Sequence, residues 1–376
     1  MKASKPRVLV TGGAGFIGSH TVDLLLEKGY AVRILDNLQE RVHPRGKPDY
    51  LPPEAEFQKG DVSDRRDMER ALEGVEYVIH LAAYQDYLPD FSTFIHTNAE
   101  STALLYELIV AKKLPVRKVV VASSQAIYGE GKFRCAEHGV IYPDSRPLEQ
   151  LRRGDWEPKC PRCGQDLAPL WITEETVRPF TAYGISKYAL ELLAFNLGRR
   201  YGVPATAMRY TYVQGPRNSF YNAYSGICRI YTLRVLNGAP PVVYEDGKQL
   251  RDYVWVGDVA AANVLCMERS ESDFRAFNVG GGKAISVLDF AKIVLEVADE
   301  SGRLRPLVRG DFRYGDTRHT FSNICALQSL GWKPTVSTTE VVRRYVDWVR
   351  TQADARDYYA ESERVMREMQ VVQTAG

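Results

Sequence analysis

The sequence predicts a doubly wound α/β fold, in which helices cover both faces of a parallel sheet, with a smaller interleaved α/β lobe. Short apolar runs alternate with helical patterns through the first half of the chain, as expected for strands buried on both faces. A glycine-rich turn joins the first such run directly to a helix. The length of 376 residues suits two closely associated cores better than one.

The expected elements follow in order from the N-terminus. Strands are expected at Arg7–Thr11, Ala31–Leu35, Tyr77–Leu81, Lys118–Ser123 and Ala205–Tyr210. Helices are expected at Ile17–Lys28, Thr97–Lys113 and Ala182–Tyr201, where apolar residues recur with helical spacing. Beyond Gly215 the pattern loosens, and Tyr253–Met267 is expected to return to the sheet as a strand followed by a helix.

These patterns divide the chain into parts. Residues 1–212 are expected to form the first domain, to which 250–268 return, and residues 213–350 a second lobe. Residues 131–170 are rich in Cys, Pro, Arg and Gly and hold no long periodic segment, which predicts an insert at the rim of the sheet. Residues 351–376 are expected to form a polar helical tail that packs weakly or frays.

The composition argues against several classes of partner. With 49 basic and 47 acidic side chains, no net field draws the chain to nucleic acid or to an anionic membrane. The sequence contains no run of about 18 apolar residues, so no membrane-spanning helix is predicted. Six cysteines without a recognisable secretory signal favour a reducing compartment, so we expect a cytoplasmic protein.

The glycine-rich turn predicts a dinucleotide site. Its glycines permit a tight turn and a close approach of the backbone to a pyrophosphate, which the N–H groups of the following helix bind. Asp36 ends the second strand, where a carboxylate accepts hydrogen bonds from the adenosine ribose and repels a 2′-phosphate, so NAD is favoured over NADP. The residues expected to contact NAD here are Gly12, Gly15, Phe16, Ile17, Gly18, Asp36 and Asn37.

Asp61 and Val62 follow a third expected strand and are placed near the adenine edge. The spacing is equally compatible with Asp61 as the cap of the next helix. The two interpretations differ in the partner that each gives to the Asp61 carboxylate.

A candidate catalytic centre combines Ser124, Tyr183 and Lys187. Ser124 follows an expected strand, and Tyr183 and Lys187 lie four residues apart in an expected helix, so both can face one ligand. A cation beside a phenol favours the phenolate, which predicts a lowered pKa for Tyr183 and a role as general base. Tyr-x-x-x-Lys alone is a weak signal in a chain with 22 tyrosines, but the upstream turn and the serine strengthen it.

The order of Gly12–Gly18, His80–Ala83, Ser123–Ser124, Tyr183–Lys187 and Arg251–Val254 resembles the extended short-chain dehydrogenase/reductase family, specifically its nucleotide-sugar epimerase/dehydratase branch, with a Rossmann-like domain. The resemblance runs from about Arg7 to Val349, without the insert. It implies that Ser124 anchors a sugar hydroxyl, Tyr183 accepts its proton, and Lys187 binds the nicotinamide ribose and tunes Tyr183. It also implies cofactor contacts from Leu81, Ala82, Ala83 and Asn98.

The resemblance further implies a nucleotide-diphosphate sugar, UDP- or dTDP-linked, as substrate, and a homodimer formed through the two helices at 97–113 and 182–201. Arg251 and Arg318 are expected to clamp the diphosphate, because guanidinium groups match phosphate oxygens. The full set of residues expected at the substrate is Ser124, Gln125, Tyr212, Arg217, Asn218, Tyr244, Arg251 and Arg318.

The expected activity is an NAD-dependent 4-epimerase that acts through a transient 4-keto sugar. Related 4,6-dehydratases carry an Asp and a Glu after the catalytic serine, whereas Gln125 and Ala126 stand here. The alternatives are a nucleotide-sugar dehydrogenase or 4-keto-sugar reductase, a dehydratase, and a catalytically idle NAD-binding scaffold.

The insert holds two candidate ligand pairs for a structural zinc ion, each with two intervening residues. They are Cys135 with His138 and Cys160 with Cys163, and such pairs bind zinc tetrahedrally. The alternative is free thiols and a surface histidine. Nucleic-acid binding is not expected, because residues 131–170 balance seven Lys/Arg against six Asp/Glu; a lid or an oligomer contact near the sugar site fits better.

Overall fold

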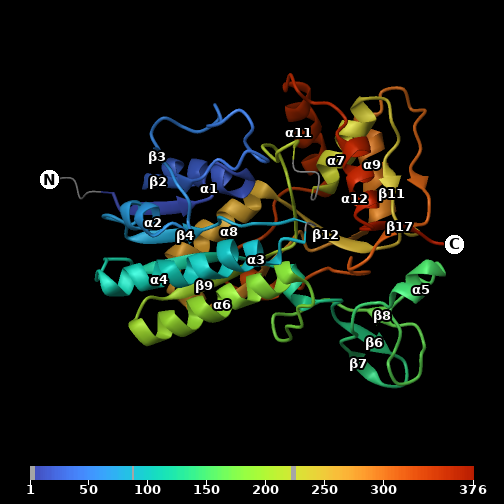
Figure 1. Cartoon of the computed structure of the whole chain (residues 1–376), viewed down its shortest axis with the longest axis horizontal. Coiled ribbons are helices and arrows are strands. Elements are labelled where there is room, and N and C mark those ends of the chain that lie inside the picture. The colour runs from blue at the N-terminus through green and yellow to red at the C-terminus, as the bar shows by residue number, and fades with distance from the viewer. Residues whose placement is uncertain (1–4, 87–88, 222–225) are drawn as a thin grey trace.

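The computed structural model describes residues 5–86, 89–221 and 226–376. A seven-stranded sheet forms its centre (Figure 1). The strands, in their order across the sheet, are β13 (Arg275–Val279), β9 (Ala205–Tyr210), β5 (Lys118–Ser124), β4 (Tyr77–His80), β1 (Arg7–Thr11), β2 (Ala31–Asp36) and β3 (Glu56–Lys59). All neighbouring pairs are parallel. The order reverses between β1 and β4, and open α/β sheets bind ligands at the carboxyl ends beside such a switch point.

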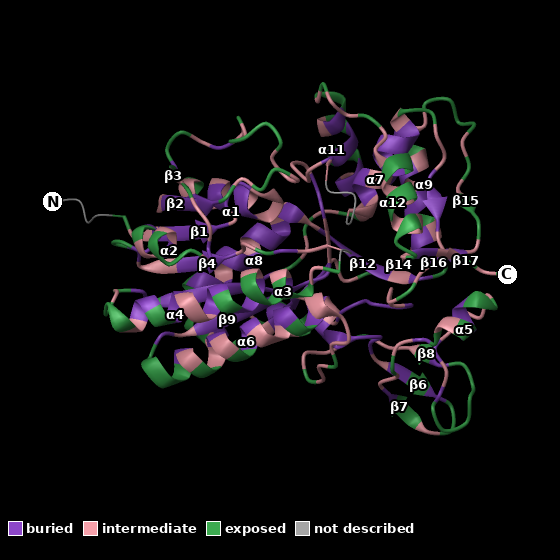
Figure 2. Cartoon of the chain, in the orientation of Figure 1, coloured by how far each residue is buried: buried purple, intermediate pink, exposed green. Residues whose placement is uncertain are grey.

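Helices cover both faces of this sheet, because alternate residues of each strand carry apolar side chains to opposite faces. Val8 and Val10 belong to one core and Leu9 to the other, and the central strands between the two cores are buried (Figure 2). The helices of the first face are α1 (Phe16–Glu27) and α8 (Val256–Glu268). Those of the second face are α2 (Arg65–Ala71), α4 (Ser101–Ala111) and α6 (Ala182–Tyr201).

The second lobe has its own core, to which three helices and two small sheets contribute; a fourth helix and a third small sheet complete the lobe. Its helices are α7 (Ile227–Leu236), α9 (Val287–Ala298), α11 (Thr338–Arg350) and α12 (Tyr359–Glu368). Its sheets are β10 (Tyr212–Gln214) with β12 (Leu250–Trp255) and β14 (Ala284–Ser286), β11 (Val242–Val243) with β15 (Leu307–Val308), and β16 (Asp311–Arg313) with β17 (Val372–Thr374).

The insert forms a separate small body at the edge of the molecule (Figure 1). It consists of a three-stranded antiparallel sheet and one short helix. Its elements are β6 (Phe133–Cys135), β7 (Gly139–Ile141), α5 (Leu148–Arg152) and β8 (Ala168–Pro169). In the sequence, the insert begins shortly after β5 and ends before α6. It therefore lies between the segments that carry Ser124 and Tyr183.

The structure confirms the predicted strands of the first domain and its helices at 17–28 and 182–201, with end differences of at most one residue. The helix predicted at 97–113 is a regular α-helix only over Ser101–Ala111, and the predicted return of 250–268 to the large sheet is corrected. Helix α8 does pack on the large sheet, whereas β12 pairs with β10 and β14. The seventh strand is instead β13, Arg275–Val279, which the sequence analysis did not predict. An apolar run such as that of β12 indicates a buried strand without indicating which sheet it joins.

The expectation of a weakly packed tail is wrong. Strand β17 pairs with β16, and Tyr359 and Val372 are buried. Arg367 pairs with the buried Asp311 at 2.6 Å, which adds a charge-assisted contact to the apolar ones. Within the described residues, no helix combines the length and apolar character needed to cross a membrane.

Candidate active site

The glycine-rich turn has the geometry of a phosphate cradle. Gly12 has a φ of +67°, and a Cβ there would lie 2.8 Å from the Ala82 backbone N. A Cβ on Gly18 would lie 2.1 Å from the Gly12 carbonyl oxygen, so strand and helix approach as only glycines allow. Helix α1 begins at Phe16 without a side-chain cap, which leaves its first N–H groups available to phosphate.

Two carboxylates lie where the adenosine half of a dinucleotide is expected. The buried Asp36 accepts hydrogen bonds from the backbone N–H groups of Ala14 (3.0 Å) and Leu38 (2.9 Å). Asn37 donates to Asp61 at 2.9 Å, so these residues lie together at the ends of β2 and β3. Helix α2 is capped by Asp64, which excludes the alternative role for Asp61 as that helix's cap; Val62 is buried beside them.

The loop Leu81–Ala83 after β4 is held by Asn98. The Asn98 side chain accepts from Tyr84 N (2.8 Å) and donates to Tyr84 O (3.0 Å) and to Ser186 Oγ (2.9 Å). It therefore ties the end of this loop to α6. Asn98 lies in a π-helical segment, η1 (Ile95–Glu100), so the helix predicted at 97–113 is regular only in α4. The extra residue in each π turn re-aims side chains at functional sites.

The three candidate catalytic residues meet at the carboxyl end of the sheet. Ser124 ends β5, and Tyr183 lies in the first turn of α6, which Thr181 caps by accepting from Gly184 N at 3.0 Å. The Ser124 side chain lies close enough to the Tyr183 hydroxyl to lower its pKa, and Ser124 Oγ accepts a hydrogen bond from Ala126 N at 3.1 Å. Lys187 lies one turn further, with its Nζ 5.9 Å from the centre of the Tyr183 ring and 2.8 Å from the carbonyl oxygen of Ala122.

The prediction that Lys187 lowers the Tyr183 pKa is wrong when only the protein's own groups surround the phenol. Desolvation raises the pKa of Tyr183 to about 12, and the Ser124 side chain opposes this shift. Desolvation also lowers the pKa of Lys187 to about 7. Burial disfavours the charged form of both groups, so the surroundings of this phenol hold it protonated until a ligand changes them.

The sequence analysis missed a buried chain of polar groups behind this centre. His80 contacts Thr11 Oγ1 through Nδ1 (2.8 Å) and Ser101 Oγ through Nε2 (3.1 Å). Burial, with a smaller effect of the Lys187 charge, lowers the pKa of His80 to about 3. A neutral imidazole therefore connects β1, β4 and α4 beneath the cofactor turn.

On the side expected to bind the substrate, the structure brings Arg251 and Tyr212 together. The Arg251 guanidinium lies 5.2 Å from the centre of the Tyr212 ring, and it donates to the carbonyl oxygens of Thr317 (2.7 Å) and Arg318 (2.8 Å). Gln125 follows Ser124 directly and is buried. Tyr244 lies under the guanidinium of Arg313, at 5.2 Å, an arginine that the sequence analysis had not selected.

The expected diphosphate contact of Arg318 is corrected, and Arg217, which was expected at the substrate, has an acidic partner. The Arg318 guanidinium is buried and donates to the carboxylates of Glu157, Glu245 and Asp246 at 2.7–3.1 Å, so acidic side chains take the place that phosphate oxygens were expected to have. Arg217 pairs with Asp23 at 2.7 Å.

Arg217 thus lies on the cofactor side. Its guanidinium lies 4.8 Å from the centre of the Tyr50 ring, and the Tyr50 hydroxyl donates to Ala14 O in the glycine-rich turn at 2.7 Å. The next residue, Asn218, lies against Gly226 at the start of α7.

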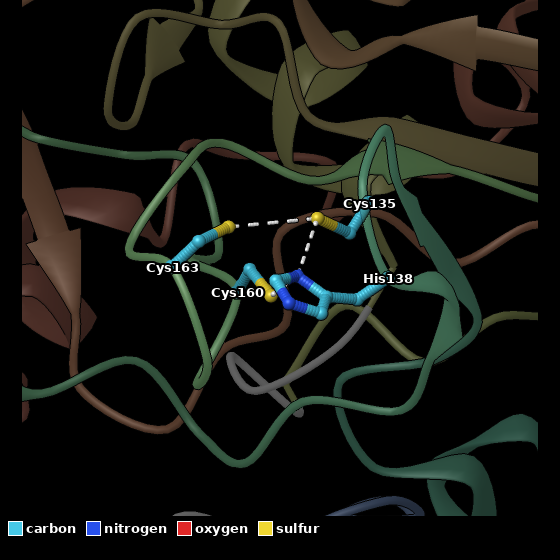
Figure 3. Close-up of side chains that lie close together, drawn as sticks. All are labelled: Cys135, His138, Cys160 and Cys163. Carbon is cyan, nitrogen blue, oxygen red and sulfur yellow. Dashed lines mark hydrogen bonds between the residues drawn. The ribbon is translucent and has the colours of Figure 1, made fainter.

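The four predicted metal ligands form one cluster in the insert (Figure 3). Their ligand atoms all lie within 4.8 Å of one another. The distances are 3.5 Å from Cys135 Sγ to His138 Nδ1, 3.6 Å from Cys135 Sγ to Cys163 Sγ, and 3.6 Å from Cys160 Sγ to His138 Nδ1. Zn–S bonds of about 2.3 Å and Zn–N bonds of about 2.0 Å give tetrahedral edges of about 3.5–3.8 Å, which these distances match.

The fold and this site together define a dinucleotide-dependent enzyme with a Ser–Tyr–Lys centre. Residues 8–147 and 164–280 match the family described as the NAD dependent epimerase/dehydratase family. The chain belongs to this family. The match omits residues 148–163, which hold the ligand pair Cys160 and Cys163.

Several relatives are similar over almost the whole chain. One is dTDP-L-rhamnose 4-epimerase of Burkholderia thailandensis, 32% identical over 93% of this chain and 97% of that protein. UDP-glucose 4-epimerase from Thermotoga maritima with UDP-glucose has a TM-score of 0.75 and 32% identity, over 92% of this chain and 98% of that one. The complex of Thermus thermophilus UDP-glucose 4-epimerase with NAD has a TM-score of 0.70 and 30% identity, over 92% of this chain and 100% of that one.

Proposed function

We propose that this protein is an NAD-dependent 4-epimerase of a UDP- or dTDP-linked sugar. The observation that carries the proposal is the meeting of Ser124, Tyr183 and Lys187 beside an uncapped, glycine-rich helix start. The named relatives are 4-epimerases of such sugars. An intact centre of this kind also argues against an idle scaffold.

The chain's residues divide the work between binding and proton transfer. Bound NAD supplies a hydride acceptor and later a hydride donor at the sugar carbon. Ser124 Oγ, which lies close enough to Tyr183 to affect its pKa, would bind the C4 hydroxyl of the sugar, and Tyr183 Oη would accept the proton of that hydroxyl. Lys187 Nζ, fixed by Ala122 O at 2.8 Å, is placed to bind the nicotinamide ribose. Return of the hydride to the other face of the 4-keto sugar, with return of the proton from Tyr183 Oη to the sugar oxygen, would give the epimer.

The dehydratase alternative is disfavoured by the side chains after Ser124. Expulsion of the C6 hydroxyl needs a general acid and a base, and Gln125 and Ala126 carry no titratable group. The dehydrogenase and reductase alternatives need a cofactor that exchanges during turnover.

The reaction class is tested by NMR in deuterated water with UDP- and dTDP-sugars and no added cofactor. We expect two C4 epimers to interconvert, with no deuterium in the sugar and no NADH accumulating, because the hydride returns within one site. Denatured enzyme should release NAD, since Asp36 disfavours a 2′-phosphate. Deuterium at a product methyl carbon establishes a dehydratase, and NADH formed in proportion to substrate establishes a dehydrogenase.

We also propose that the insert holds a structural zinc ion through Cys135, His138, Cys160 and Cys163. Their tetrahedral spacing supports this, and the 3.6 Å between Cys135 Sγ and Cys163 Sγ is far longer than the disulfide bond of about 2.05 Å. Four protein ligands leave no position for a substrate, as in structural sites. Such a site needs reduced thiolates, in keeping with a cytoplasmic location.

A homodimer is proposed on a revised set of apolar residues. Of the apolar residues on the helices at 97–113 and 182–201, Leu105, Leu108, Ile109 and Leu190 are buried in the monomer's own core. Four other apolar side chains on neighbouring elements are exposed, namely Phe91 and Ile95 of α3 (Phe91–Phe94) and η1, and Ile185 and Leu192 of α6. Each pair recurs with helical spacing, so it forms one row.

Leu192→Arg should therefore convert a dimer to a monomer, because it places a charge in the apolar contact between two copies. Light scattering at micromolar concentration measures the change. Val140→Arg is a matched control, since Val140 is 48% exposed and Leu192 is 52% exposed, but Val140 lies in the insert. A monomeric wild-type protein, or a dimer that Leu192→Arg leaves intact, contradicts the proposed interface.

A further inference from the structure

The insert contacts the second lobe through a buried cage of charges around Arg318. The Arg318 guanidinium donates to Glu245 (2.7 Å), Asp246 (2.7 and 3.1 Å) and Glu157 (2.7 and 3.0 Å). Its side chain is 1% exposed. Glu157 belongs to the insert and lies three residues before the ligand Cys160, whereas Glu245 and Asp246 belong to the second lobe.

A second arginine, Arg146 of the insert, also links the insert to the second lobe. Arg146 contacts Glu245 (2.9 Å) and Glu130 (3.3 Å), and both carboxylates are buried. Arg146 also donates to Asp316 O at 2.8 Å, and Glu130 accepts from the Arg318 backbone N at 2.8 Å. Glu130 follows the Ser124 segment by six residues, so the cage joins that segment, the insert and the second lobe.

The signs of these charges argue against a phosphate ligand for Arg318. Four carboxyl groups, those of Glu130, Glu157, Glu245 and Asp246, surround the guanidinium groups of Arg146 and Arg318. A diphosphate brought to this place would meet more carboxyl groups than guanidinium groups, and the carboxylates that already bind Arg318 would repel it. Carboxylates therefore occupy Arg318 as its partners.

The cage fixes one end of a loop that faces the substrate side. Residues 313–320 begin at the end of β16 and carry Arg313, which lies over Tyr244. The backbone of the same loop accepts two of the three hydrogen bonds that the Arg251 guanidinium donates, and the third goes to Leu250 O. A shift of Arg318 thus moves the carbonyl groups that hold Arg251.

We propose that Glu157 is a positioning residue for substrate binding, which acts by holding Arg318 and hence the loop 313–320. It lies in the stretch 148–163 that the family match omits, so this anchor is an addition of the insert. The inference rests on the proposed function in that the loop's ligand is taken to be a nucleotide-diphosphate sugar. The insert would thereby contribute to substrate affinity. This contribution would depend on the metal cluster, because Glu157 lies three residues before the ligand Cys160.

The test replaces Glu157 by Gln in the full-length protein, which keeps the side chain's size and removes its charge. We expect KM for the UDP- or dTDP-sugar to rise about tenfold, a typical coupling between linked sites, with kcat changed less than about threefold. Arg318→Lys should raise KM in the same direction, because an ammonium cannot satisfy three carboxylates. The double variant should show little further loss. Glu149→Gln, in the same insert and 73% exposed, is the matched control.

The alternatives predict other results. If Arg318 binds the diphosphate in competition with Glu157, Glu157→Gln lowers KM while Arg318→Lys raises it. If the cage is only structural, Glu157→Gln lowers the melting temperature and leaves KM unchanged. Either result overturns the proposal.

Two readouts do not depend on turnover. Hydrogen exchange over residues 313–320 should be faster in Glu157→Gln, and calorimetry should show weaker binding of UDP or dTDP. A wild-type enzyme that turns over no nucleotide sugar refutes the proposed function, whereas unchanged loop exchange in the variant refutes this inference.

Discussion

Replacing Tyr183 by Phe should lower kcat by about 10²–10⁴-fold, the usual cost of losing a general base. Only the ionisable hydroxyl is removed, and the ring keeps its contact with Phe94, whose ring centre lies 6.3 Å away. Cofactor content should therefore remain near that of the wild type. The measurement is steady-state epimerisation, with NAD released from denatured protein as the second readout.

The pH dependence gives this prediction a sharper form. Desolvation raises the pKa of Tyr183, so its phenolate increases as the pH rises and the wild-type rate should rise with it. Tyr183→Phe should lose that rise along with the rate. Tyr188→Phe, on the same helix, is a control that removes a hydroxyl from the neighbouring cluster of Ile127, Tyr128 and Ile172. Near-normal turnover by Tyr183→Phe contradicts the proposed chemistry.

The residues that sequence analysis placed correctly act through local geometry. Tyr183 and Lys187 lie one helical turn apart, and Asp36 is the last residue of an apolar strand. Their places could therefore be predicted from their spacing along the sequence. The ligand pairs of the insert are local in the same sense. Their meeting in one cluster required only that a short insert fold back on itself.

The parts that could not be predicted depend on partners far apart in the chain. Glu157 and Arg318 are separated by 161 residues, and Arg146 and Glu245 by 99. Nothing in the local sequence distinguishes these arginines from surface charges, and the family resemblance assigned Arg318 to phosphate. The pKa of Tyr183 was mispredicted for a related reason, since proximity to Lys187 was visible in the sequence whereas burial was not.

The metal site makes the second large prediction. The purified protein should contain near one zinc per chain, and a Cys160→Ser Cys163→Ser double variant should contain almost none, because two thiolates are lost from a four-ligand site. Structural zinc sites contribute about 10–16 kcal/mol of binding free energy at neutral pH. The insert's own core is small, made of Phe133, Ile141 and Leu167 with two of the cysteines, so metal loss should unfold the insert and expose it to protease.

Elemental analysis and limited proteolysis measure these effects, with Cys325→Ser as the control, since that free cysteine is exposed and lies outside the cluster. Substitution of cobalt for zinc in the wild-type protein gives an independent readout, because thiolate–cobalt charge-transfer absorption appears only when the cysteines are ligands. Metal loss should also release Glu157, which lies three residues from Cys160, and so raise KM for the nucleotide sugar as Glu157→Gln does. A metal-free native protein whose insert resists protease contradicts the site.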